Sequence, residues 1–171
     1  TACFNSNAED DPYMKFLNLD DFDRAWIFRH KDLPLEDATK LAIKPYTEEV
    51  SNQLWNQYIS QQSGHSSQFT ATDWPSKSST WVEKAQWQSA WDSDNPSLPS
   101  SVLEFLDWDD NTNVLFFYDS DRVVETSWKI FKASWKNFLF FDDGPILLGK
   151  KRSQAVQFLQ DGSVLLGSRP K

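Results

Sequence analysis

Apolar residues in the first part of the chain recur with helical spacing. Asp20 and Asp21 precede the apolar positions of residues 22–29, which predicts a short amphipathic helix with carboxylates in its first turn. Thr47 is suited to cap a second helix, because apolar residues follow at i, i+4, i+5, i+8 and i+9 across residues 50–59. We therefore expect this half of the chain to be mainly helical.

Residues 60–80 interrupt this pattern with a polar stretch rich in Ser, Thr and Gln. A structureless loop of this length is uncommon in a compact domain, so we expect either short turns or a mobile functional segment. Trp87 and Trp91 then have the i, i+4 spacing of one helical face. A further helix is predicted to start near Pro99.

The hydrophobic period changes in the last third. Residues 114–118 form an apolar β-branched and aromatic run, and residues 119–121 form a turn before the return strand of a hairpin. An apolar stripe at i, i+3, i+7 and i+10 predicts a helix over residues 128–138. Short apolar runs follow at residues 138–141, 146–148, 155–159 and 164–166, and Asp161-Gly162 is a strong hairpin signal.

Together these patterns predict an α+β fold, in which a helical N-terminal two-thirds packs on a C-terminal antiparallel β-meander. Residues 1–8 resemble the remnant of a protease-cleavable expression tag, because Phe4 and residues 6–8 match a common linker. We assign residues 9–171 to a single α+β domain. Cys3 lies in the tag-like segment, so we expect no thiol chemistry in the native chain.

Composition narrows the class of protein. Aromatic residues make up 15% of the chain and the net charge is −8, which argues for a folded acidic domain. No apolar run approaches the roughly 18 residues of a membrane span. Residues 9–25 are acidic and lack the pattern of a signal peptide, so we expect a cytoplasmic protein without membrane contact.

The charge is divided unevenly along the chain. Residues 1–121 contain 8 basic and 21 acidic residues, whereas residues 122–171 contain 9 basic and 4 acidic residues. Within one domain, such halves are expected to present complementary surfaces to each other.

Four carboxylates form the first candidate site. They follow two predicted apolar runs, and parallel neighbouring strands would bring them to one edge of a sheet, where they could bind Mg²⁺ or work as an acid–base pair. An ordinary Asp-rich turn is the alternative. The four residues are Asp119, Asp121, Asp142 and Asp143.

Loop-adjacent aromatic residues form the second candidate site. Tryptophan rings stack on ligands and peptides, and most of the nine tryptophans fall on apolar helical faces. The residues near loops or element ends are therefore the better surface candidates: Trp74, Trp81, Trp108 and, in the polar loop, His65. His65 has no Gly-x-Ser-x-Gly nucleophile motif to accompany it.

Basic residues of the last third form the third candidate. They could hold a phosphate backbone, although an acidic protein with a pI of about 4.7 repels nucleic acid at long range. We therefore expect no nucleic-acid partner and a solvated surface instead. The patch comprises Lys129, Lys132, Lys136, Lys150, Lys151 and Arg152.

Four strings resemble a family of single-domain gammaproteobacterial proteins catalogued only as a domain of unknown function. They are RAWIFRH at 24–30, DWDDNT at 107–112, WKNFLFFDDGP at 135–145 and LGSRP at 166–170. The resemblance covers about residues 14–170 and implies a small bacterial cytosolic protein, without an activity, cofactor or catalytic residue.

We expect a protein-binding or regulatory module rather than an enzyme, with no cofactor and another protein as partner. Two alternatives remain open: a metal-dependent hydrolase that uses the clustered aspartates, and small-ligand binding in a pocket lined by tryptophan. The sequence leaves the oligomeric state open.

Overall fold

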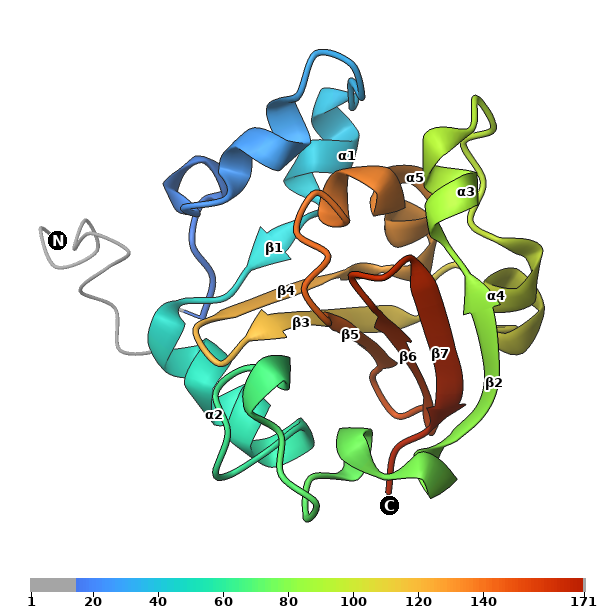
Figure 1. Cartoon of the computed structure of the whole chain (residues 1–171). Coiled ribbons are helices and arrows are strands. Elements are labelled where there is room, and N and C mark those ends of the chain that lie inside the picture. Colours follow the sequence, from blue (N-terminus) through green and yellow to red (C-terminus); the bar gives the residue numbers. More distant parts are fainter. Residues whose placement is uncertain (1–14, 171) are drawn as a thin grey trace, which may run out of the picture.

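The computed structural model describes residues 15–170, and its centre is a twisted antiparallel sheet with helices on both faces (Figure 1). The seven strands of this described part follow the order β1-β4-β3-β5-β6-β7-β2. Their bounds are β1 Lys44–Pro45, β2 Trp81–Gln86, β3 Asn113–Asp119, β4 Arg122–Ser127, β5 Ile146–Gly149, β6 Gln154–Phe158 and β7 Ser163–Ser168.

Helices are short and lie between the strands in sequence. Residues 15–170 form five α-helices and several 3₁₀ turns, and none of these helices is long and apolar enough to cross a membrane. The α-helices are α1 Asp37–Leu41, α2 Glu48–Tyr58, α3 Gln88–Asp92, α4 Ser100–Phe105 and α5 Trp128–Phe138. The 3₁₀ turns include η3 Leu19–Asp21, η4 Ala25–Arg29, η5 Ser66–Gln68, η6 Trp74–Ser76 and η7 Ser78–Thr80.

The sheet separates two hydrophobic cores. Along β3, Val114, Phe116 and Tyr118 belong to one core, and Leu115 and Phe117 belong to the other. Successive side chains of a strand point to opposite faces of the sheet, so both faces of β3 are covered. This double burial explains why residues 114–118 are continuously apolar and do not alternate with polar residues.

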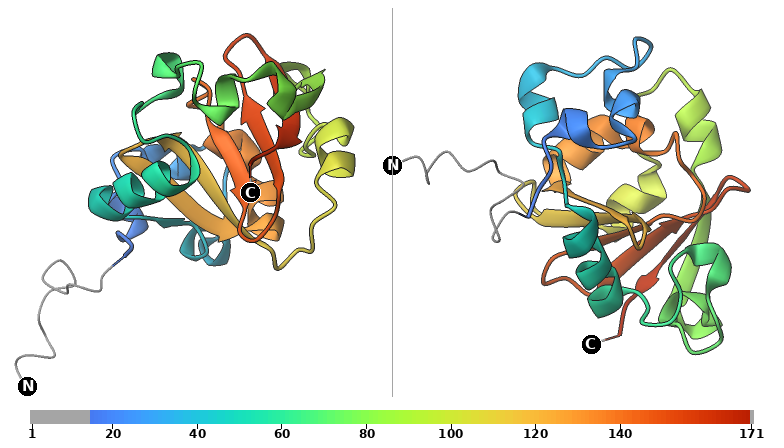
Figure 2. Two further views of the ribbon diagram at one scale, coloured as in Figure 1. Left: turned by 90° about the horizontal axis from the view of Figure 1, so that it is seen from below. Right: turned by 90° about the vertical axis from the view of Figure 1, so that its left-hand side faces the viewer.

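Different helices cover the two faces (Figure 2). The buried aromatic residues of α5 pack on one face, where the ring centroids of Phe116 and Phe138 lie 5.0 Å apart. Trp55 of α2 and Phe69 pack on the opposite face. The layers that cover the two faces of the sheet therefore form separate surfaces of the molecule.

Several local predictions are confirmed. The side chain of Thr47 caps α2 by accepting a hydrogen bond from the backbone N–H of Val50, and α5 spans the predicted stripe. Strands β3 and β4 form the predicted hairpin, and β6 pairs with β7 around Asp161-Gly162.

The predicted arrangement of a helical N-terminal two-thirds on a C-terminal meander is wrong. Strands β1 and β2 come from the part expected to be helical, and they occupy the two edges of the sheet. Segment 81–86 forms β2 because its backbone pairs with β7, a long-range contact that local periodicity does not report. The tag-like residues 1–8, with Cys3, lie outside the described residues.

Two smaller predictions also fail. The segment 22–29 is a 3₁₀ helix with three residues per turn at η4, and the apolar run 138–141 is the end of α5 and the loop after it. Apolar spacing suggested an α-helix in the first segment, and a short apolar run suggested a regular element in the second.

The polar segment 60–80 is organised by one buried carboxylate. Asp73 is 3% exposed and accepts hydrogen bonds from Ser60 Oγ at 2.6 Å, Ser63 Oγ at 3.0 Å and the backbone N–H of Thr70 at 2.8 Å. Burial raises the pKa of Asp73, but these hydrogen bonds outweigh burial and lower its pKa overall. The segment is thus a series of short turns, one of the two outcomes expected for it.

Candidate functional site

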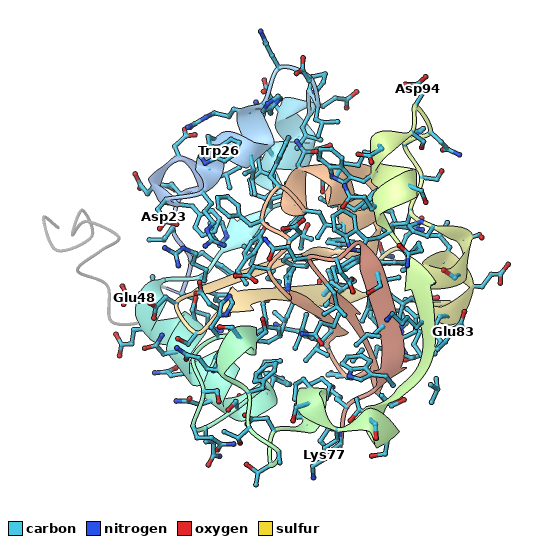
Figure 3. The ribbon with its side chains drawn as sticks, in the orientation of Figure 1. Asp23, Trp26, Glu48, Lys77, Glu83 and Asp94 are labelled. Carbon is cyan, nitrogen blue, oxygen red and sulfur yellow. The ribbon has the colours of Figure 1, made fainter. Side chains whose placement is uncertain are left out.

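Trp26 is a large aromatic side chain exposed on η4. Its neighbours Ala25, Ile27 and Phe28 are buried, whereas Trp26 is 46% exposed. With three residues per turn, Trp26 and the exposed Arg29 lie on the same side of the 3₁₀ helix. The helix therefore presents this ring to solvent, and Figure 3 shows Trp26 near Asp23 at the edge of the molecule.

Four partly buried aromatic rings pack next to Trp26, either directly or through Phe140. The centroid of the Trp26 ring lies 5.5 Å from that of Phe140 and 5.8 Å from that of Phe141. Phe140 in turn stacks on His30 at 4.9 Å and meets Trp91 edge-on at 5.5 Å. We call these residues the Trp26 surface: Trp26, His30, Trp91, Phe140 and Phe141.

A buried amide holds this surface together. Asn137 is 2% exposed, and its Nδ2 donates to the backbone carbonyl oxygens of Ile27 at 2.9 Å and Leu33 at 3.0 Å. Asn137 lies near the end of α5, three residues before Phe140. The amide thereby fixes η4 against α5, so the rings from the two segments meet in a preformed arrangement.

An ion-pair network borders the surface. The guanidinium of Arg24 lies 3.9 Å from the centroid of the Phe141 ring and 3.9 Å from Oδ2 of Asp119. Arg122 pairs with Asp119 at 2.8 Å and with Asp23 at 2.7 Å. The hydrogen bond from Arg122 is the main cause of the lowered pKa of Asp23.

Asp142 follows Phe141 directly and is half-buried. No cation of the described residues lies within ion-pair distance of it. Burial raises the pKa of Asp142, and the charge of Asp143 adds to this shift. Asp142 is therefore a half-buried carboxylate next in sequence to Phe141 of the Trp26 surface.

The four predicted carboxylates are near one end of the sheet but bind different groups. Antiparallel pairing of β3 with β5, and not the parallel pairing considered from the sequence, brings both turns to that end. Asp119 pairs with arginines, Asp121 accepts from Asn52 at 2.9 Å, and Asp143 faces His65 at 3.2 Å. Within residues 15–170, no three His, Cys, Asp or Glu side chains converge as metal ligands would.

His65 takes part in a local turn. Its Nδ1 accepts the backbone N–H of Ser67 at 3.0 Å, which leaves Nε2 to donate to Asp143. Ser66 Oγ donates to the carbonyl oxygen of Asp143 at 3.0 Å. These contacts connect η5 to the turn before β5.

The three nominated tryptophans differ in exposure. Trp108 is buried and packs edge-on against Trp128 at 5.3 Å. Trp74 and Trp81 are half-buried and lie 6.0 Å apart, and each indole N–H donates to a backbone carbonyl. Trp74 also lines a groove with a volume of about 710 Å³ beside the C-terminal end of α2.

The predicted basic residues contact different groups in separate parts of the chain. Lys132 pairs with Asp110 at 2.8 Å, and Lys136 donates to the backbone oxygen of Ser93 at 2.8 Å. Lys150 pairs with Glu125 at 2.8 Å, and Arg152 lies 3.8 Å from Asp109. Lys129 and Lys151 are exposed. Two of these partners, Asp109 and Asp110, are acidic residues of the segment 1–121.

Comparison with known proteins assigns the family. Residues 16–167 match the model of a family described as "Protein of unknown function (DUF2947)". The chain belongs to this family. The expected resemblance to a family of unknown function is thereby confirmed, and the gammaproteobacterial origin stays a prediction. No curated protein and no solved structure matches the chain.

The segments that form the Trp26 surface all lie within the DUF2947 match. The amphipathic helix predicted for residues 22–29 has a period of 3.6 residues, which places Trp26 on its apolar face. The available signal was the charged Arg29 at i+3 from Trp26, since a 3₁₀ helix places these two residues on one side.

Proposed function

We propose that this protein is a non-catalytic protein-binding module, and that its partner docks on the Trp26 surface. The observation that carries the proposal is a tryptophan 46% exposed on a platform of four other aromatic rings. Tryptophan and arginine are enriched among the residues that dominate binding energy at protein interfaces. Exposed apolar groups with a polar rim mark interaction sites in proteins.

The surface is preorganised for binding. Asn137 fixes η4 to α5, and Arg24 is stacked over Phe141 between the rings and Asp119. Binding of a partner would therefore cost little conformational entropy of these side chains, because they are already ordered. The ion pairs of Arg24 and Arg122 form the polar border that is typical around an apolar interface centre.

The charges near the Trp26 surface favour a partner segment that carries an apolar side chain next to a lysine or arginine. The apolar side chain would cover Trp26, and the cation would pair with Asp142. Arg24 and Arg122 are already paired with aspartates, so they leave little positive charge to attract an acidic partner. The expected cytoplasmic location belongs to this proposal, since the partner would be another cytoplasmic protein.

A differential capture experiment tests this function. Immobilised wild-type chain and the variant Trp26→Ser would be exposed to the same lysate of the source organism. The matched control is Val82→Ser, which removes another exposed hydrophobic side chain (74% exposed) from β2. We expect a protein that is retained by wild type and Val82→Ser and lost with Trp26→Ser. Equal capture by all three chains would refute the proposal.

Purified components then give the magnitude. A buried tryptophan anchor typically contributes about 2 kcal/mol or more, so Trp26→Ser should weaken the affinity at least about thirtyfold. Asp142→Asn should weaken it less, with a smaller dependence of affinity on salt concentration.

A further inference from the structure

Two hollows lie at the end of the molecule away from the Trp26 surface, and both are lined by residues of the chain after β7. The first, of about 710 Å³, lies between the end of α2, η6, η7 and this chain segment. The second, of about 290 Å³, lies at the turn between β5 and β6. Arg169 and Pro170 line both hollows, and we call the two hollows together the groove. Lys77, which marks this end in Figure 3, lies far from Trp26.

The groove is positively charged although the protein is acidic. Four cations line it: Lys77, Lys151, Arg152 and Arg169. The only carboxylate among its described lining residues is Asp73, which is 3% exposed and engaged by hydroxyl and backbone donors. Although the chain as a whole carries a net charge of −8, this local excess of cations favours an anionic ligand in the groove.

Arg169 is held in place by three contacts. Its backbone N–H donates to the carbonyl oxygen of Ser153 at 2.9 Å, and its Nε donates to that of Arg152 at 2.9 Å. Its guanidinium carbon lies 5.4 Å from the centroid of the Tyr58 ring. No carboxylate of residues 15–170 pairs with Arg169. A fixed guanidinium with free N–H donors is a suitable group for an oxyanion.

Lys151 supplies a second cation at the same end of the groove. It is exposed at the tip of the β5–β6 turn, and its φ of 62° lies in the left-handed region. No carboxylate of the described part lies within ion-pair distance of Lys151. Arg152 lies 3.8 Å from Asp109, so Arg169 and Lys151 are the two unpaired cations that line the smaller hollow.

The wider hollow is lined by uncharged hydrogen-bonding groups. Side-chain amides of Asn56, Gln57 and Gln61 and hydroxyls of Ser79 and Thr80 lie along it, together with the rings of Tyr58 and Trp74. Amides and hydroxyls of this kind satisfy the hydroxyl groups of a small polar molecule. This composition suits the body of a hydroxylated ligand whose charged group lies near Arg169.

We propose that the groove binds a phosphate monoester of a small hydroxylated molecule, with Arg169 and Lys151 holding the phosphate. A phosphate monoester carries nearly two negative charges at neutral pH, which matches two free cations better than a single carboxylate does. This site shares no residue with the Trp26 surface, so the two proposals stand or fall separately.

The test is a titration of the ¹⁵N-labelled chain with glycerol 3-phosphate, and separately with inorganic phosphate and with glycerol, followed by NMR at constant ionic strength. We expect saturable shifts of residues 151–153 and 169, tighter binding of glycerol 3-phosphate than of inorganic phosphate, and no response to glycerol. Arg169→Gln and Lys151→Gln should each weaken binding about tenfold or more. The matched control Lys84→Gln removes an exposed lysine from β2 and should bind as wild type does.

Three results would overturn the proposal: no saturable shift with either phosphate compound, shifts confined to residues outside the groove, or unchanged affinity in both groove variants. Lys151→Gln keeps the test decisive if Arg169→Gln does not fold, because the side chain of Lys151 pairs with no acidic group of the described residues. Equal affinity for glycerol 3-phosphate and inorganic phosphate would refute the part of the proposal that concerns the hydroxylated body.

Discussion

Asn137 donates a hydrogen bond from Nδ2 to the carbonyl oxygen of Ile27 at 2.9 Å, across 110 residues of sequence. A second hydrogen bond from the same nitrogen reaches Leu33. A single buried amide therefore connects the two segments that carry the Trp26 surface. Its removal would leave the buried carbonyl of Ile27 and the partly buried carbonyl of Leu33 without this donor, which carries a desolvation cost.

We expect Asn137→Ala to lower the free energy of unfolding by about 2–4 kcal/mol because of the unpaired carbonyls and the small cavity. Urea denaturation checks this value. Lys129→Ala, at an exposed position of the same helix, should change the stability by less than about 0.5 kcal/mol. Similar values for the two variants would contradict the role given to Asn137.

Trp26 and Trp135 should respond differently to truncation. Trp135 is 1% exposed, so Trp135→Ala should cost about 3–5 kcal/mol of stability. Trp26 is nearly half exposed, and Trp26→Ala should cost less than about 1.5 kcal/mol. Thermal and urea unfolding of both variants test this contrast, and a large loss with Trp26→Ala would mean that the ring supports the fold instead of a binding surface.

Asp73 should make the protein sensitive to acid. Its pKa in the folded state is lowered, so the unfolded chain binds the proton more readily and the contribution of Asp73 is lost as the pH falls below about 4. Asp73→Ala should cost about 2–4 kcal/mol at neutral pH, since several donors lose their acceptor. The difference from wild type should shrink between pH 5 and pH 2, as measured by urea unfolding at each pH; a constant difference would argue against the ionised acceptor.

Asp142 should have the opposite effect. Its pKa is raised in the folded state, so its charge disfavours folding at neutral pH, and its contribution to stability improves as the pH falls through the folded pKa. Asp142→Asn should leave stability at pH 7 unchanged or raise it by up to about 1 kcal/mol. Thermal melts at pH 7 and pH 4 provide the measurement, and a clear loss of stability at pH 7 would show that the carboxylate has a folded-state partner.

Gly167 allows β2 to approach β7 closely. A Cβ at this position would overlap the carbonyl oxygen of Thr80, a backbone atom that cannot rotate away. Gly167→Ala should therefore cost about 1–3 kcal/mol and loosen the edge strand β2. Gly64→Ala is the control, since its nearest neighbour is the hydroxyl of Ser120 at 3.1 Å, which can turn aside. Hydrogen exchange of β2 amides would report the loosening, and its absence would contradict this account.

Local signals in the sequence determined the elements that depend on neighbouring residues. The stripe of residues 128–138 predicted α5, Thr47 predicted the start of α2, and Asp161-Gly162 predicted the hairpin of β6 and β7. Each of these depends on periodicity, capping or turn chemistry within a few residues. The acidic and aromatic composition likewise indicated a folded domain without help from the structure.

The tertiary structure decided where the sheet begins and which side chains reach solvent. Segment 81–86 becomes a strand because β7 offers it a partner. Trp26 is exposed on the 3₁₀ helix η4, which Asn137 holds through the carbonyl of Ile27. The cations of the groove come together from the β5–β6 turn and the chain after β7. These features depend on contacts between residues far apart in the sequence, and a local pattern does not encode which distant segment supplies the other half of a contact.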